Sequence, residues 1–368
     1  MNPLVSIVIP VYNGANYMRE AIDSALAQTY ENCEILVVND GSNDGGITEE
    51  IALSYGDKIR YFAKKNGGVA TALNMGIENM RGEYFSWLSH DDLYHVHKIS
   101  RQIETLSAQE DKKTLITCGF ACVDGEGREL SDSTCVDAKG REQSGDDAAS
   151  YTDEQLGTPL FVFLKGILKG GLLFGCSLLV HKEHFARVGT FNVELLTNDI
   201  DLWFRMMRNQ PLIYLREPLA IRRRHDGQDT VTKSALLVPA FHEFLLNVAK
   251  TLTDEEIIQV YGSRGKFYEE LKYAGGEVTS YVNAKAAEEG LTLGGNTQTM
   301  EDLKAVILSN GALTSEQHEM ALRALQAIQE QYEENSREIR QEYEASISWK
   351  ITKPLRWAKK IWHTKRFS

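Results

Sequence analysis

The sequence has few cysteines and no long apolar run. Its five cysteines among 368 residues are odd in number and show no paired zinc-ligand spacing. Neither a disulfide framework nor a zinc site is therefore indicated, and reduced thiols are expected. No apolar segment approaches the length that would cross a bilayer. The start, residues 4–10, is too short and lacks the basic lead of a secretory signal, which favours a location inside the cell.

Basic charge is scarce over most of the chain. The net charge is −12, but residues 346–368 hold seven Lys or Arg and no Asp or Glu. The remaining 345 residues therefore carry 33 basic against 52 acidic side chains, a net charge of −19. A body of this charge repels polyanions, whereas contact with nucleic-acid phosphates needs a basic face. Nucleic acid is not expected as a partner of the body.

Two common nucleotide-binding motifs are missing. Gly67 and Gly68 precede a predicted helix, but the pattern is not G-x-G-x-x-G, and no P-loop is present. The absence of the dinucleotide fingerprint argues against an oxidoreductase. The absence of a Gly-rich, basic loop after the first predicted strand argues against a nucleotidyltransferase.

Short apolar runs alternate with amphipathic helices along the first 230 residues. Runs rich in β-branched residues predict strands, and apolar spacing of three and four predicts helices. Strands are predicted at 5–9, 34–39, 59–62, 84–88, 115–120, 176–180 and 212–215. Helices are predicted at 17–28, 69–79, 96–107 and from residue 202. Residues 124–157 are predicted to form a long irregular excursion, and residues 221–228 a basic loop. A right-handed crossover would bring the loops after Ile9 and Val38 to one edge of a sheet. The sequence thus predicts an α/β fold with helices flanking the sheet.

One acidic pair follows a predicted strand directly. Asp91 and Asp92 come straight after the apolar run 84–88, at the rim where open α/β sheets bind ligands. Carboxylate oxygens there would hold a divalent cation. The alternative is that residues 89–92 only cap the following helix, since Ser and Asp are favoured at helix N-termini.

A second acidic cluster precedes the helix predicted from residue 202. Asp199 lies near the helix N-terminus, where the helix dipole would keep a carboxylate ionised for use as a base. The alternative is that Thr197 or Asn198 only caps this helix. His225 follows three arginines; this basic stretch is either a solvated strand end or the partner of the acidic edge.

The last third of the chain is predicted to be helical. A helical extension is expected over 236–312, with a capping box from Thr253 to Glu256. A long helix over 313–347 would form a coiled coil and a homo-oligomer contact. Residues 348–368 form a basic tail with three tryptophans. An amphipathic helix of this kind binds an anionic membrane surface, although it would alternatively pack on protein.

Six short stretches occur in a distinctive order: residues 5–13, 38–42, 66–74, 89–92, 198–199 and His225. Together they resemble the family 2 glycosyltransferases, which are inverting enzymes of the GT-A fold, over roughly residues 1–230. The resemblance implies a GT-A domain at 1–235, a Rossmann-like mixed sheet flanked by helices. The basic, Trp-rich tail is similar to the ending of enzymes that build bacterial surface polysaccharides.

The resemblance also implies roles for individual residues. The positions that would bind the nucleotide sugar are Pro10, Tyr12, Asn13, Asp40, Asn66, Asn74 and Asp91. Asp91 and His225 would hold a divalent metal, Mg²⁺ or Mn²⁺, and Asp199 would be the catalytic base. Two positions depart from the family pattern, because Ser89 replaces the first acid of the metal motif and Asn198 the first acid of the Glu-Asp pair.

The implied reaction is transfer of a sugar from a UDP- or dTDP-sugar to a hydroxyl of a glycan or polyprenyl-linked acceptor. The setting would be synthesis of cell-surface polysaccharide or lipopolysaccharide, on the inner face of the cell membrane. The departures at Ser89 and Asn198 motivate an alternative. A catalytically degenerate module of the same fold would bind glycans or act as a scaffold.

Overall fold

The computed structural model describes residues 2–130, 147–169, 172–272, 274–291 and 293. Residues 1–284 form one compact unit and residues 285–368 a second, and each is considered by itself. The predicted long helix at 313–347 and the tail at 348–368 lie outside the described residues. The predicted domain division at residue 235 stays a prediction.

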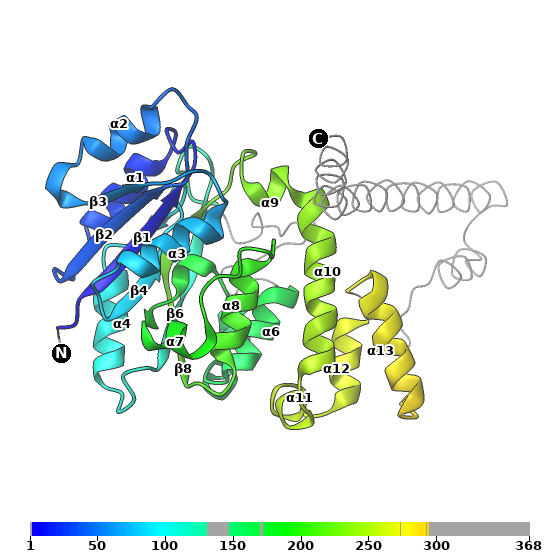
Figure 1. Cartoon of the computed structure of the whole chain (residues 1–368). Helices are drawn as coiled ribbons and strands as arrows, with labels where there is room; N and C mark the ends of the chain where they lie inside the picture. Colours follow the sequence, from blue (N-terminus) through cyan, green and yellow to red (C-terminus); the bar gives the residue numbers. More distant parts are fainter. Residues whose placement is uncertain (1, 131–146, 170–171, 273, 292, 294–368) are drawn as a thin grey trace, which may run out of the picture. The chain divides into compact units, whose positions relative to one another are not determined.

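A five-stranded sheet forms the first half of the chain, in the order β3-β2-β1-β4-β7 (Figure 1). Its strands are β1 Val5–Val11, β2 Cys33–Asn39, β3 Arg60–Ala63, β4 Tyr84–Trp87 and β7 Val180–His181. The first four are parallel and β7 is antiparallel to β4. The carboxyl ends of β1, β2 and β4 therefore share one edge, as the crossover argument predicted.

Helices cover both faces of this sheet. The odd residues of β1 pack into one core cluster with α1 (Met18–Leu26). On the opposite face Val8 meets α3 (Val69–Asn79) at Gly76, where an added Cβ would lie 2.3 Å from Val8 Cγ1. Glycine lets the helix approach the strand this closely. Every residue of β1 is buried, as a central strand with two covered faces requires.

A second sheet, in the order β5-β8-β6, continues the fold. It consists of β5 Leu93–Tyr94, β6 Leu115–Val123 and β8 Leu212–Arg223. The predicted basic loop at 221–228 is wrong for its first three residues, because β8 runs through them. The strand continues past Glu217 and Pro218 because the register with β6 shifts around Gly119, which accommodates the irregular residues.

The remaining helices of the described residues lie between and after these strands in the sequence. They are α2 Ile47–Leu53, α4 Lys98–Ser107, α5 Asp153–Leu156, α6 Pro159–Lys169, α7 Glu183–Val188, α8 Asn198–Met207, α9 Asp229–Thr232, α10 Ser234–Thr251, α11 Asp254–Tyr261, α12 Arg264–Leu271 and α13 Gly276–Glu288. The predicted capping box at Thr253 is confirmed. In the part of the chain that the structure describes, no single helix has the length and apolarity to cross a membrane; α10 and α11 reach them only as a pair bent by 109°.

Two local predictions are wrong. The strand predicted at 176–180 is wrong for its first part, since a 3₁₀ turn spans Gly175–Ser177; only Leu179, in an isolated bridge, and Val180, in the two-residue β7, make β pairings. The side chain of Ser177 bonds Thr117 and that of Cys176 bonds Asp92, and these tertiary contacts outweigh the local strand propensity. Cys33, Cys118 and Cys176 are free thiols as expected, whereas Cys122 is disulfide-bonded.

Candidate functional site

The loops after β1 and β2 are joined by asparagine side chains. Asn13 adopts a left-handed φ of 51°, a conformation that asparagine tolerates better than most residues. Its Nδ2 donates to Asn43 Oδ1 at 2.8 Å, and the Asn43 N–H donates back to Asn13 Oδ1 at 2.8 Å. Pro10 lies in β1 and Tyr12 is exposed beside this junction. Three predicted binding positions thus lie together at the carboxyl edge.

Asp40 is buried at the end of β2 and holds the next loop. Its carboxylate accepts hydrogen bonds from Lys64 Nζ at 2.5 Å, from the Gly67 N–H at 3.0 Å and from the Gly68 N–H at 2.7 Å. Asn66 lies in this loop, exposed to solvent. Next to Asp40, Gly41 has a φ of +70°, and a Cβ there would lie 2.5 Å from the Asn66 amide nitrogen. The edge therefore has no room for a larger residue at position 41.

Asp91 and His225 are 134 residues apart in sequence and in direct contact in the structure. His225 Nε2 lies 3.1 Å from Asp91 Oδ2, and the two side chains are 17% and 14% exposed. Burial alone would raise the pKa of Asp91, but the hydrogen bond with His225 and the nearby His90 bring it below the ordinary value. The two predicted metal ligands thus lie in direct contact, and the surroundings favour the ionised form of the Asp91 carboxylate beside the His225 ring.

Asp92 has a different environment from its neighbour. Its Oδ1 accepts the Arg223 main-chain N–H at 2.9 Å, and Cys176 Sγ lies 3.6 Å from Oδ2. Burial, together with the charge of Asp91, raises the pKa of Asp92 to about 8. The N-cap of the following helix α4 is His97, which makes no side-chain cap. The capping alternative for this acidic pair is therefore wrong, and Asp92 links the acidic loop to β8 instead.

Asp199 lies in the first turn of α8, whose N-cap is Thr197. Burial raises the pKa of Asp199, against the opposing effect of the Ile200 backbone N–H. Arg205 fixes the helix from one turn further along, through Asp201 at 2.8 Å and the Thr190 carbonyl at 3.0 Å. Thr197 makes no side-chain cap, so the capping alternative is wrong for Thr197. No hydrogen bond among the described residues joins Asp199 to Asp91 or His225.

Asn74 is fully engaged by main chain. Its Nδ2 donates to the Phe191 carbonyl at 2.9 Å, and the Phe191 N–H donates to its Oδ1 at 3.0 Å. The Asn74 amide therefore ties α3 to the segment that leads into α8 and Asp199. Its predicted contact with a nucleotide sugar stays a prediction.

Two residues that the sequence did not single out complete the edge. Lys64 pairs with Asp40, and Arg223 bonds the main chain of Asp91 at 3.0 Å. Lys64 follows a short strand, which is a weak signal. Arg223 lies in a run of three arginines, and nothing in that run marks which one is buried.

The donor set at Asp91 and His225 suits a hard divalent cation. A carboxylate oxygen and an imidazole nitrogen are ligands that Mn²⁺ accepts, and carboxylate oxygen is the ligand that Mg²⁺ prefers. Over the described residues, no group of three or more His, Cys, Asp or Glu side chains converges to hold a metal. The protein would therefore supply two ligands and leave the remaining positions to oxygens of a ligand and water.

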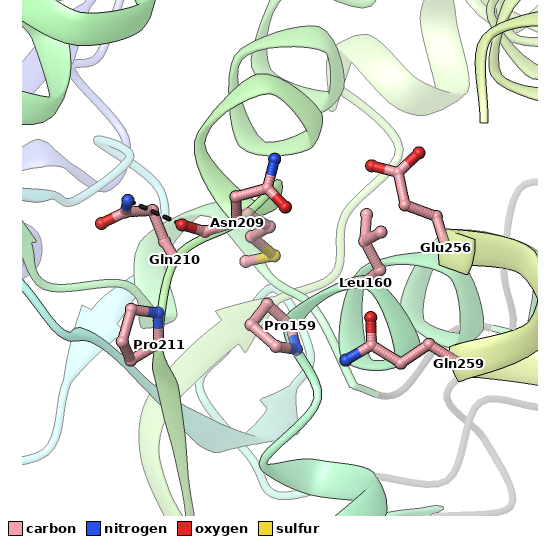
Figure 2. A pocket seen from close by; sticks show the side chains of 8 residues that line it. Pro159, Leu160, Asn209, Gln210, Pro211, Glu256 and Gln259 are labelled. Atoms are coloured by element: carbon pink, nitrogen blue, oxygen red, sulfur yellow. Dashed lines mark hydrogen bonds between the residues drawn. The ribbon is translucent and has the colours of Figure 1, made fainter. Parts of the chain in front are cut away.

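A hollow is lined by a different set of residues (Figure 2). It has a volume of about 240 Å³ and lies between the start of α6, the turn from α8 to β8, and α11. Its lining consists of Pro159, Leu160, Met207, Asn209, Gln210, Pro211, Glu256 and Gln259. None of the predicted site residues is among them, so the hollow is not part of the candidate site.

Comparison with known proteins decides the family. The profile described as glycosyl transferase family 2 matches residues 6–161. A protein of Rickettsia typhi described as an uncharacterized glycosyltransferase is 44% identical over 298 residues, which are 80% of this chain and 87% of the relative. The chain belongs to glycosyltransferase family 2. A second uncharacterized glycosyltransferase, from Rickettsia felis, is 47% identical over 265 residues, which are 71% of this chain but only 40% of the relative.

The fold of this family 2 chain is GT-A, as the sequence predicted. A mannosyltransferase from Pyrobaculum calidifontis, solved in complex with GDP-Man and Mn²⁺, superposes with a TM-score of 0.52. The match covers 88% of this chain and 85% of that one at 14% identity, so it concerns the fold alone. Family membership supports a transferase that uses a nucleotide sugar, and the expectation of an enzyme is confirmed at this level.

Proposed function

We propose that this family 2 enzyme transfers a sugar, with inversion, from a UDP- or dTDP-sugar to a hydroxyl of a glycan or lipid-linked acceptor. The observation that carries the proposal is the Asp91–His225 contact at the carboxyl edge of the sheet, 3.1 Å between Oδ2 and Nε2. It lies where α/β sheets bind ligands and pairs two groups suited to a metal-bound diphosphate.

In the proposed transfer, Asp199 at the N-terminus of α8 acts as the base. The acceptor oxygen attacks the sugar C1 as the bond from C1 to the diphosphate oxygen breaks, and the hydroxyl proton goes to the Asp199 carboxylate. A single in-line displacement inverts the anomeric configuration. The raised pKa of Asp199 makes it a stronger base than an exposed carboxylate.

A divalent cation, when bound, neutralises charge on the departing diphosphate. Asp91 and His225 would hold it, together with diphosphate oxygens and water. Because the described residues would supply only these two ligands, metal affinity is expected to be low without nucleotide and higher with it. Asp40 and the loop that it orders, Asn66–Gly68, are proposed to receive the nucleoside.

The acceptor and the location are proposed from the sequence. The basic tail at 348–368, with three tryptophans and seven cations, supports peripheral attachment to the inner face of the cell membrane. Attachment there would serve synthesis of surface polysaccharide or lipopolysaccharide. A homo-oligomer through 313–347 is part of the same proposal.

The proposal is tested by incubating the full-length protein with a panel of UDP-, dTDP- and GDP-sugars, with and without Mn²⁺ or Mg²⁺. We expect binding by calorimetry for at least one UDP- or dTDP-sugar, tighter with metal than without it, and slow donor hydrolysis that depends on metal. Failure to bind or hydrolyse any donor would contradict the proposed enzymatic activity and favour the alternative of a glycan-binding module or scaffold.

Asp199→Asn separates catalysis from binding. Loss of the base is expected to lower the rate of donor hydrolysis and sugar transfer about 10²- to 10⁴-fold. Donor affinity should remain within about twofold of the wild-type value, since Asp199 has no bond to Asp91 or His225 among the described residues. Unchanged turnover would remove Asp199 from its role.

A further inference from the structure

Arg223 is among the largest fully buried side chains in the part of the chain that the structure describes, and its side chain is 1% exposed. Burying a guanidinium away from water costs several kcal/mol unless its donors are satisfied. A buried guanidinium therefore needs hydrogen-bond acceptors for its N–H groups. The structure provides these acceptors, and each belongs to a different part of the site.

All three guanidinium nitrogens of Arg223 are used. Nε donates to the Asp91 carbonyl at 3.0 Å, Nη1 to the Gly125 carbonyl at 3.1 Å, and Nη2 to the Glu20 carboxylate at 2.6 Å. These acceptors belong to the β4–β5 loop, to the turn after β6 and to α1. One side chain therefore joins the main chain of Asp91 to two other segments, the turn after β6 and α1.

Tyr17 extends this arrangement to His225. Its ring lies 4.7 Å from the Arg223 guanidinium and its centroid lies 4.8 Å from that of the His225 ring. Gln228 closes the other side, because its Nε2 donates to the Arg223 carbonyl at 2.7 Å and its Oε1 accepts the His225 N–H at 3.3 Å. Both proposed metal ligands are thus held by the surroundings of Arg223.

We infer that the Arg223–Glu20 ion pair is a positioning device that presents Asp91 and His225 to the metal-bound diphosphate of the donor. This inference rests on the proposed function and adds residues that contact neither donor nor metal. Glu20 fixes the guanidinium, the guanidinium fixes the Asp91 main chain, and Tyr17 orients the His225 ring. Partners of metal ligands set ligand orientation in this way, and their loss commonly lowers metal affinity about 10- to 100-fold.

Glu20 provides the cleaner test because its side chain is 56% exposed, so its replacement leaves the core intact. Glu20→Ala removes the carboxylate from Arg223, whereas Glu20→Gln keeps an oxygen that accepts from Nη2. Asp23→Asn is the matched control, since Asp23 is an exposed acid on the same helix that bonds Tyr55 rather than Arg223. Arg223→Lys and Arg223→Met form a second pair, which keeps or removes the positive charge.

The measurement is calorimetric binding of UDP with Mn²⁺ and, separately, of UDP in EDTA, with thermal melting as the test of folding. We expect Glu20→Ala to weaken Mn²⁺·UDP binding about tenfold, Glu20→Gln to weaken it less, and Asp23→Asn to match the wild type. Binding of UDP in EDTA should stay unchanged in all three, and the melting temperature should stay unchanged in Glu20→Gln and Asp23→Asn. Glu20→Ala is expected to melt at a lower temperature, because the Arg223 guanidinium loses one of its partners.

Two results would overturn the inference. Equal Mn²⁺·UDP affinity in Glu20→Ala and the wild type would show that the pair positions nothing. Equal losses with and without metal would show general loosening of the site. If the wild type binds no UDP with Mn²⁺, the same variants are measured with dTDP and Mn²⁺; if it binds neither nucleotide, the proposed function fails first. If the Arg223 variants do not fold, the two Glu20 variants still decide the question.

Discussion

Asp92 and Asp199 are two carboxyl groups whose pKa values are both raised by burial. Their surroundings differ, and we propose different roles for them. Asp92 accepts the Arg223 N–H at 2.9 Å and lies beside the Asp91 charge, which raises its pKa further, to about 8. It is a structural link whose surroundings favour the protonated form. Asp199 lies in the first turn of a helix, where only backbone N–H groups oppose the effect of burial.

The raised pKa of Asp199 predicts the pH dependence of the reaction. The base is active when ionised, so kcat/KM should fall as the pH drops through the raised pKa, at a higher pH than for an ordinary aspartate. The folded state binds this proton more tightly than the unfolded chain, so the group costs stability above that range. Asp199→Asn should therefore unfold at a higher urea concentration at pH 7. An acid limb at the ordinary aspartate pKa, with no gain in stability, would contradict both expectations.

Sequence reasoning reached some of these residues and missed others for a physical reason. Asp91 and Asp199 were predicted from acidic clusters next to a strand and a helix. The resemblance in motif order connected Asp91 with His225, because no local rule brings together residues 134 positions apart. Arg223 and Glu20 were missed because burial of one arginine in a run of three depends on tertiary contacts. The different environments of the adjacent Asp91 and Asp92 have the same origin.

At the scale of elements, Glu256 joins α11 to the turn after α8. Its carboxylate binds Arg208 through two bonds, 2.6 and 2.7 Å long, and also accepts the Thr253 N–H at 2.9 Å in the capping box. Burial alone would raise the pKa of Glu256, but the Arg208 hydrogen bonds lower it. The stability that Glu256 contributes is therefore present above the ordinary glutamate pKa and is lost as the pH falls through the lowered value.

Glu256→Ala is expected to lower the free energy of unfolding by about 2 to 4 kcal/mol at pH 7, because it removes a cap and a bidentate ion pair. Glu255→Ala is the matched control, an exposed acid in the same first turn, and should change it by less than about 0.5 kcal/mol. Urea denaturation of both variants measures the difference. Equal effects would mean that the Arg208 contact adds nothing.

The four parallel strands of the first sheet were predicted closely. The runs at 5–9, 34–39, 59–62 and 84–88 marked β1 to β4 to within two residues at each end. The seven-residue helix α2 was missed because it is too short to show an apolar period. The strand β8 was underestimated because Glu217 and Pro218 read locally as its end, whereas pairing with β6 carries it on.

At the scale of the whole molecule, charge is divided between an acidic body and a basic tail. Deleting residues 349–368 is expected to release the protein from vesicles of phosphatidylcholine and phosphatidylglycerol in a sedimentation assay, because seven cations are lost. Donor binding should remain. Raising the salt concentration should release the full-length protein in part, since screening weakens the attraction. Equal sedimentation of the truncated form would favour a tail that packs on protein.

The two hydrogen bonds between Asn74 and Phe191 bear on how such enzymes can be recombined. They connect a helix of the donor-binding half to the segment that carries the proposed base, across 117 positions of sequence. A chimaera that takes its first half from one relative and its second half from another would separate the two partners. An engineer who exchanges acceptor halves should therefore transplant position 74 together with the segment around 191, as one inherited unit.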